Sequence, residues 1–248
     1  KPSVELVVGG NLVAHAITVV VRLLMTDRQV LTGFLGRMEK SLLTALLKLG
    51  WDFHRPVLAG IVFQRVDMAL LVGLADSEQI GYYNVALSIA SAQTVLATAV
   101  NSVSFPRIAA SRGREAYNLL LRHLVVAVPV TAAVCALFIG LAPQIIATLF
   151  GTGFLPATSV TRVLIAAVMM WQWSQVLDYG LRGLGDARPG FTAYSVGLCM
   201  AIPTGYVLYR SLGILGMAVA MLAAHALSAC LLCWNFCRRY RRARMEAD

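Results

Sequence analysis

The sequence predicts an all-α protein, a polytopic bundle of about seven transmembrane helices. The first observation is the composition, since 58% of the 248 residues are hydrophobic and only 13% are charged, with a mean hydropathy of +0.73. Soluble domains carry about 25% charged residues, and a soluble core of this size could not hide so much apolar side chain. The second observation is a series of apolar runs near the length of about 20 residues that a helical crossing needs. The third is that basic residues occupy every second connection between those runs, as membrane topology requires.

The apolar runs follow one another along the whole chain. They are Val4–Met25, Val57–Leu74, Ile80–Phe105, Leu119–Leu141, Leu155–Tyr179, Phe191–Tyr209 and Leu212–Phe236. Between the first two, apolar residues recur at helical spacing beside Arg37, Lys40 and Lys48. This pattern predicts an amphipathic helix, which either lies on an anionic membrane surface or serves as an ordinary cytosolic linker.

The connections between runs predict the topology. Bases follow the third, fifth and seventh runs, at Arg107, Arg112, Arg114, Arg122, Arg182, Arg188, Arg238, Arg239, Arg241, Arg242 and Arg244. The intervening connections carry Asp76 and Glu78, then no charge, then only Arg210. The positive-inside rule therefore places the basic connections and the C-terminal tail in the cytoplasm and Lys1 outside. An arginine-rich tail can also bind nucleic acid, but a charge cluster after an apolar run is typical of a stop-transfer signal, so we expect no nucleic-acid partner.

No constellation in the sequence indicates catalysis or a metal centre. The five cysteines lie in or beside apolar runs, where we expect small packing residues without a disulfide framework or a metal. None of the four histidines has a metal-ligand partner one helical turn away, although His15 and His225 lie at mid-span. The sequence therefore predicts no catalytic residue, no metal and no cofactor, and a protein that is not an enzyme.

The second apolar run carries ionised groups at its middle, Arg65 and Asp67, next to Gln64. Each charge at the centre of a bilayer costs roughly 2.5–3.5 kcal/mol, and such residues usually line a polar cavity. Gln64 and Asp67 fall on one helical stripe with Gly60 and Leu71. Arg65 is two residues from Asp67, so we expect it to point elsewhere and not to pair with that carboxylate.

Further polar residues lie in other runs. Arg162, Gln172, Gln175 and Asp178 belong to the fifth run, and the last three step by three residues, which predicts a shared face. For Asp178 and for Arg22 the alternative is that they lie near cytoplasmic ends and extend toward the headgroups. Arginines fixed inside a cavity suit an anionic group, above all a phosphate, and a buried carboxylate carries a coupling proton or holds an arginine. The predicted substrate-binding or coupling residues are Gln64, Arg65, Asp67, Arg162, Gln175 and Asp178.

Several short motifs occur in a defined order along the chain. They are Leu46-Leu-Lys-Leu-Gly50, Gln64-Arg-Val-Asp67, Leu70-Leu-Val-Gly73, Gly81-Tyr-Tyr-Asn-Val-Ala86, Phe105-Pro106, Leu149-Phe-Gly151, Phe154-Leu-Pro-Ala157, Leu181-Arg-Gly-Leu-Gly185 and Arg188-Pro189. In order and spacing they resemble the second lobe of polysaccharide flippases of the MOP superfamily.

The resemblance implies the C-terminal lobe of a two-lobe MOP-type transporter. Residues 1–25 then form the last helix of the first lobe, residues 26–53 a cytoplasmic amphipathic linker, residues 54–237 a six-helix second-lobe bundle and residues 238–248 a basic cytoplasmic tail. The chain starts at Lys1 and enters an apolar run almost directly, without a signal peptide. We therefore expect a fragment whose earlier helices are missing and which does not transport alone.

The resemblance also implies a substrate, an undecaprenyl-pyrophosphate-linked oligosaccharide that alternating access moves across the bacterial inner membrane for lipopolysaccharide O-antigen, capsule or exopolysaccharide. Its partners would be this anionic substrate, membrane lipids, and the polysaccharide polymerase and chain-length machinery. A multidrug or cation antiporter and a lipid II flippase of the same superfamily remain alternatives. A membrane-embedded glycosyltransferase or polymerase is a further alternative, but it would need large outer loops with carboxylates, and the outer connections offer only Asp76 and Glu78.

Overall fold

The computed structural model describes residues 40–95, 98, 106–111 and 113–245, together with five helical residues between positions 13 and 21. Its principal elements are α3 (Lys40–Leu74), α4 (Ser77–Ala92), α6 (Gly113–Leu149), the 3-10 helix η1 (Thr152–Ala157), α7 (Thr158–Gly183) and α8 (Arg188–Met245). None of the residues in these ranges is in a strand, so the all-α prediction is confirmed. The predicted run Val4–Met25 lies mostly outside the described residues, as do Arg22 and the linker before Lys40.

The chain divides into two compact units, Lys1–Gly50 and Trp51–Asp248. In the first unit the structure describes mainly the start of α3, where every residue from Ser41 to Gly50 is exposed. Helix α3 continues without interruption through Pro56 to Leu74. The end of the predicted linker and the second apolar run are therefore parts of one helix.

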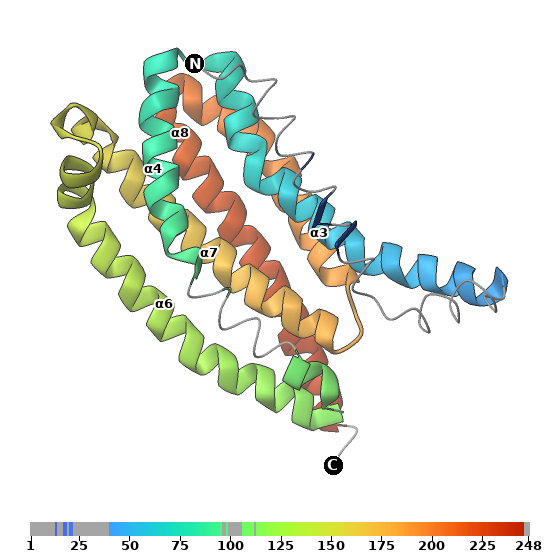
Figure 1. Ribbon diagram of the computed structural model, residues 1–248. Coiled ribbons are helices and arrows are strands. Elements are labelled where there is room, and N and C mark those ends of the chain that lie inside the picture. Colours follow the sequence, from blue (N-terminus) through green and yellow to red (C-terminus); the bar gives the residue numbers. More distant parts are fainter. Residues whose placement is uncertain are drawn as a thin grey trace. The chain divides into compact units, whose positions relative to one another are not determined.

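Four helical segments in the described part of the chain are long and apolar enough to cross a membrane. They are Ser41–Leu74, Glu115–Leu149, Thr152–Gly183 and Arg188–Ala243. The last has 56 residues, more than twice the length of about 20 that one crossing needs, and its backbone is non-helical at Gly213, with φ 61° and ψ −142°. Helix α8 turns back there, so that it forms two legs (Figure 1), which correspond to the predicted sixth and seventh runs. Together with α4 at the start of the third run, these helices confirm a polytopic transmembrane bundle.

Side-chain contacts show which helix ends lie together in the second unit. At one end, the Tyr209 hydroxyl donates to the Leu74 carbonyl at 2.9 Å. At the other end, the Tyr240 hydroxyl donates to Asn118 Oδ1 at 3.3 Å, and Arg239 pairs with Asp186. The crossings therefore alternate in direction, and the arginines between α7 and α8 share an end of the bundle with those of the C-terminal stretch.

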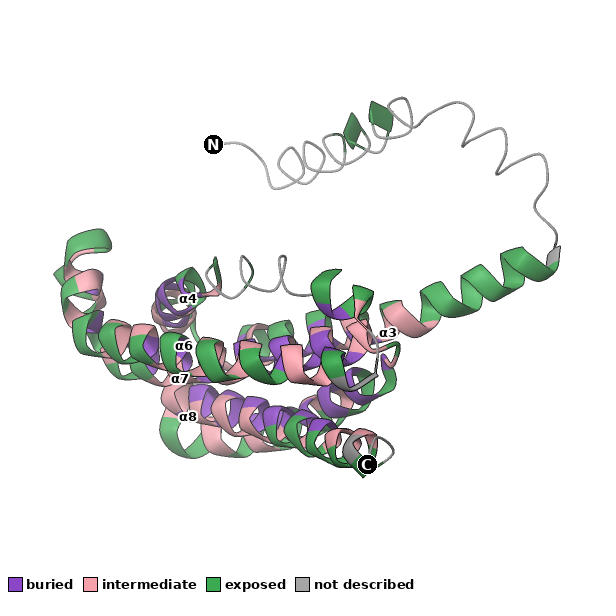
Figure 2. Ribbon diagram, turned by 90° about the horizontal axis from the view of Figure 1, so that it is seen from below, coloured by how far each residue is buried: buried purple, intermediate pink, exposed green. Residues whose placement is uncertain are grey.

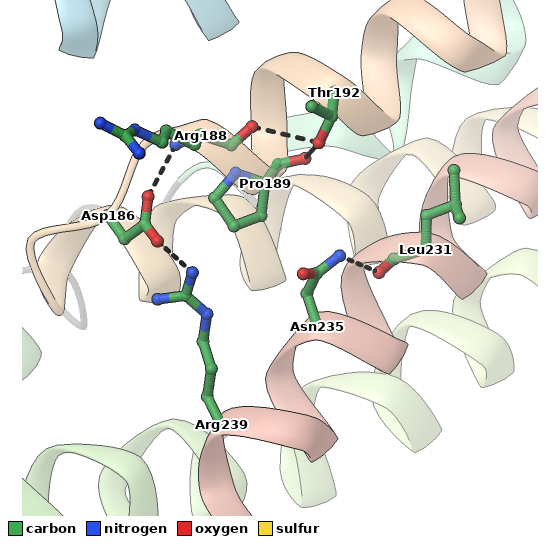
Figure 3. A network of polar contacts seen from close by, with 7 residues as sticks. All are labelled: Asp186, Arg188, Pro189, Thr192, Leu231, Asn235 and Arg239. Carbon is green, nitrogen blue, oxygen red and sulfur yellow. Dashed lines mark hydrogen bonds and ion pairs between the residues drawn. The ribbon is translucent and has the colours of Figure 1, made fainter. Parts of the chain in front are cut away.

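The turn between α7 and α8 is fixed by backbone and side-chain contacts. Gly185 has a φ of +86°, which favours glycine, and the following Asp186 N–H donates to the Leu181 carbonyl at 3.0 Å, closing the helix end. The Asp186 carboxylate accepts from the Arg188 N–H at 2.9 Å and pairs with the Arg239 side chain (Figure 3). The turn is thereby tied to the last turns of α8.

Helices α7 and α8 carry most of the buried surface, whereas α6 lies at the edge of the bundle. In the most apolar stretch of α6 only 11% of the residues are buried, whereas 50% are buried in the corresponding stretch of α8. Most of α6 therefore faces outward (Figure 2). The two legs of α8 approach each other closely where Ser228 donates to the Ala193 carbonyl at 3.0 Å. Gly197 lies at this crossing, where a Cβ would come within 2.7 Å of the Phe63 ring.

We predict that Gly197→Ala destabilises the bundle by about 1–3 kcal/mol, because the added methyl group overpacks a closed interface. Gly140→Ala is the matched control, since no atom lies within 4 Å of a Cβ at that position in α6. Alanine there should be neutral or stabilising by up to about 1 kcal/mol through its higher helix propensity. Unfolding midpoints of the two variants in the same detergent test this, and equal midpoints would contradict the close approach at Gly197.

Candidate functional site

A polar cavity of about 80 Å³ lies between α3, α4, α7 and α8, and we call it the central cavity. Helix α3 contributes three polar side chains, the end of α4 and the residues just after it contribute hydroxyl groups, and α7 and α8 contribute rings. These residues are Gln64, Arg65, Asp67, Ser91, Thr94, Trp171 and His225. The structure therefore brings the three polar residues predicted in the second run into one site.

Asp67 connects α3 to α4 within this site. Its side chain is buried, with 2% of the residue exposed. The carboxylate accepts a hydrogen bond from the Tyr83 hydroxyl at 2.8 Å and another from the Met68 N–H at 2.7 Å. Hydrogen bonds to an ionised group contribute about 1.5–3 kcal/mol each, so Asp67 and Tyr83 hold the two helices in register.

Arg65 is exposed, yet it lines the same cavity as Asp67. The prediction that it points elsewhere is therefore wrong: positions 65 and 67 are about 200° apart around the helix axis, yet both residues line the cavity. The expectation that the two residues do not pair agrees with the structure. Asp67 bonds to Tyr83, and no ion pair joins it to Arg65 in the described range 40–95. The arginine is left free to meet a ligand at the open side of the cavity.

A second cavity of about 140 Å³, the basal cavity, adjoins the first. Gln64 and Trp171 line both cavities, so the two are neighbours along the contact between α3 and α7. The basal cavity extends toward the C-terminal end of α7, where Gln175 and Arg182 reach it. Of the predicted residues, Gln64 and Gln175 therefore share this second cavity.

Asp178 lies behind the basal cavity and is fully buried. Its carboxylate forms an ion pair with Arg182 one helical turn further along α7, and the Tyr194 side chain of α8 lies beside it. Gly190, in the first turn of α8, packs so closely that a Cβ there would overlap the carboxylate. The alternative that Asp178 extends toward the headgroups is wrong, because an internal cation provides the partner that it needs.

The structure separates the other predicted residues from these cavities. Gln172 is 3% exposed and lines an apolar groove between α6 and α7, next to Trp173. Gln175 lines the basal cavity instead, so the two glutamines line different cavities although they are one helical turn apart. Arg162 is exposed near the opposite end of α7, where its Nε donates to the Ile139 carbonyl at 3.2 Å.

Several residues of the site were not predicted. The charge pattern groups Arg182 with the bases after the fifth run, although its position four residues after Asp178 is the spacing of a helical ion pair. His225 was noted only for its depth, and its ring lies 4.5 Å from the ring of Phe63 and 5.4 Å from that of Trp171. No group of three His, Cys, Asp or Glu in the described part of the chain is arranged to hold a metal ion.

The fold and the cavities together define a class of protein, a multi-pass α-helical membrane protein with buried polar sites between its helices. Residues 2–159 match the model of a family described as polysaccharide biosynthesis protein. The chain belongs to this family. A search of curated proteins found no match.

Two solved structures resemble the chain and show that it has the fold of transporters of the MOP superfamily. One is the Vibrio cholerae MATE transporter VcmN in the bent form, with a TM-score of 0.66 and 19% identity over 81% of this chain and 47% of that one. The other is an outward-facing multidrug resistance MATE family transporter of the MOP superfamily, with a TM-score of 0.64 and 20% identity over 79% of this chain and 45% of that one. The chain thus spans about half the length of each.

We predict that Tyr83→Phe destabilises the protein by about 1.5–3 kcal/mol, because Asp67 loses a hydrogen-bond donor in a buried site. The neighbouring Tyr82→Phe is the matched control, since the Tyr82 hydroxyl donates to Glu78 on an exposed surface. Its loss should cost no more than about 1 kcal/mol. Unfolding midpoints of both variants in one detergent compare the two effects, and a larger loss for Tyr82→Phe would refute the role given to Tyr83.

Proposed function

We propose that the chain is part of a flippase, a transporter rather than an enzyme, that moves undecaprenyl-pyrophosphate-linked oligosaccharide across the bacterial inner membrane for O-antigen, capsule or exopolysaccharide synthesis. The observation that carries the proposal is the central cavity, which places Arg65 and Asp67 between transmembrane helices. Membership in a polysaccharide biosynthesis family supports the substrate class. The MOP fold supports movement by alternating access of two lobes.

The chemistry of the central cavity suits a charged sugar carrier. A guanidinium group matches the oxygens of a pyrophosphate, and an exposed Arg65 can reach them without first breaking an internal ion pair. Gln64, Ser91 and Thr94 offer donors and acceptors for sugar hydroxyls. Asp67 is engaged with Tyr83, so we assign it the role of holding α3 and α4 around the site, and a coupling proton would act on the same contact.

The orientation that we propose places the basic end of the bundle and the C-terminus in the cytoplasm. The bases at this end include Arg107, Arg188 and Arg238. Asp76 lies between α3 and α4, and Glu78 lies in the first turn of α4. In this orientation the lipid-linked substrate would enter from the cytoplasmic leaflet. Polysaccharide polymerase and chain-length machinery would then receive it on the other side.

A multidrug or cation antiporter is the second candidate, favoured by the buried carboxylate of Asp67 in the central cavity. Arg65 opposes this candidate, because its charge repels a cation from the same cavity. Deletion of the gene for the full-length protein distinguishes the two. Increased retention of a cationic dye would support the antiporter, and loss of surface polysaccharide would support the flippase.

We predict that Arg65→Ala in the full-length protein lowers surface polysaccharide by about tenfold or more, since a charge-assisted contact of about 1.5–3 kcal/mol is lost. Asp67→Asn should lower it as well, through loosening of the contact with Tyr83. Surface polysaccharide is measured in cells that contain normal amounts of each variant in the membrane.

Arg162→Gln is the control for this experiment, because Arg162 is also an arginine of a transmembrane helix but lies outside both cavities. It should leave surface polysaccharide within about twofold of the wild type. Normal polysaccharide in both Arg65→Ala and Asp67→Asn cells would remove the central cavity from the transport path.

The proposed orientation is tested by reporter fusions. We predict that a fusion after Asp248 is active with a cytoplasmic reporter, whereas a fusion in the connection at Asp76 is active only with a reporter that requires export. Substitution of Arg238, Arg241 and Arg242 by glutamine should weaken this preference, because the positive charges set it. The reverse reporter pattern in the unmodified chain would contradict the orientation.

A further inference from the structure

The basal cavity is lined by a buried arginine, Arg182, which does not line the central cavity. Arg182 is the only charged residue among the described residues that line it. Its side chain is 10% exposed, which is a high degree of burial for a guanidinium. A buried charge of this kind requires a partner or a ligand.

Two neighbours on α7 hold the Arg182 guanidinium in place. The Asp178 carboxylate forms an ion pair with it through Nη2, and the Tyr179 ring centroid lies 4.6 Å from its Cζ. The Arg182 Nε is buried, and no hydrogen-bond partner for it exists in the part of the chain that the structure describes. The guanidinium therefore keeps an unused donor while it faces the cavity.

The other walls of the basal cavity are neutral and suited to a polar ligand. Gln64 and Gln175 provide amide donors and acceptors from facing helices, and Trp171 and Tyr194 provide ring surfaces. No acidic side chain is among the described lining residues, so the charge that lines the cavity itself is the Arg182 guanidinium, with its Asp178 partner behind it. Such a lining favours an oxyanion that carries further polar groups.

We propose that the basal cavity binds a pyrophosphate group whose oxygens replace Asp178 as the partner of Arg182. Asp178 is then a placeholder, a carboxylate that keeps the guanidinium ionised and correctly placed while the site is empty. The planar guanidinium can give two parallel hydrogen bonds to one oxyanion, which a single carboxylate contact through Nη2 does not use. The inference depends on the proposed function only for the group to which the pyrophosphate is attached.

Replacement of Asp178 by the ligand has a cost in free energy, which limits the affinity of the site and so allows the ligand to be released. When Arg182 turns to the ligand, Asp178 stays buried without its cation, and an uncompensated buried charge is costly. The Tyr194 hydroxyl beside the carboxylate can donate to it and offsets part of this cost. The ionisable groups facing Asp178 are Arg182 of its own helix and Tyr194 of α8, while α3 contributes neutral Gln64 to the cavity.

The test measures binding of radiolabelled inorganic pyrophosphate to the purified chain in nanodiscs of phosphatidylcholine, which has no net charge to compete. Asp178→Asn removes the competing charge at nearly constant shape, so pyrophosphate should bind about tenfold more tightly than to the wild type. Arg182→Gln should bind about tenfold more weakly or not at all. Arg188→Gln, at an exposed arginine of the same end that does not line the cavity, should change affinity less than about twofold.

The double variant Asp178→Asn/Arg182→Gln guards against misfolding of Arg182→Gln, which leaves Asp178 unpaired. It carries neither charge, so it should keep the unfolding midpoint of Asp178→Asn and still fail to bind. The inference is overturned if Asp178→Asn binds no more tightly than the wild type, or if the double variant binds as Asp178→Asn does.

A parallel measurement with farnesyl pyrophosphate distinguishes a lipid-borne from a free anion. Tighter binding than that of inorganic pyrophosphate, lost in the double variant, supports a lipid-linked ligand in this site. Failure of the proposed function can be distinguished from failure of this inference, because binding of pyrophosphate does not require its translocation. Expected affinities together with normal surface polysaccharide after gene deletion would leave this site intact and remove the flippase.

Discussion

An ionised side chain inside a bilayer must find its partners within the protein, since lipid offers none. Asp67 and Asp178 meet this requirement in two different ways. Asp67 takes hydrogen bonds from a tyrosine of the next helix and from the backbone, whereas Asp178 takes a cation from its own helix. The first solution fixes helix against helix, and the second places a buried anion and a buried cation side by side on α7.

These two solutions divide the polar interior into parts with different chemistry. The central cavity has an exposed arginine that is not engaged by the neighbouring Asp67, and the basal cavity has a buried arginine that is engaged by a carboxylate. Trp171 and Gln64 lie between them and line both. An anion that passes along the contact between α3 and α7 would therefore meet two guanidinium groups in succession. Binding to Arg65 would break no ion pair with Asp67, whereas binding to Arg182 would displace Asp178.

The packing around the cavities is consistent with a rigid support for these groups. Phe63, Trp171, Tyr194 and His225 form a ring cluster with centroid distances between 4.5 and 6.5 Å. Glycines at 190 and 197 allow α8 to approach Asp178 and Phe63 where no side chain would fit. Helix α6 exposes most of its apolar surface and contributes none of the described lining residues of either cavity.

The sequence alone determined the membrane class, most of the crossings, the alternation of basic connections and the presence of polar Gln64, Arg65 and Asp67 inside the second run, because hydropathy, charge and spacing are local properties. It could not determine which polar groups meet. Tyr83 reaches Asp67 from the next helix, and Trp171 and His225 reach the same cavity from α7 and α8, so their meeting depends on how each helix is rotated about its axis. Only packing fixes that rotation, because small residues such as Gly190 and Gly197 decide how closely helices approach. The tertiary structure for this reason separated Arg162 and Gln172 from the site and placed Arg182 within it.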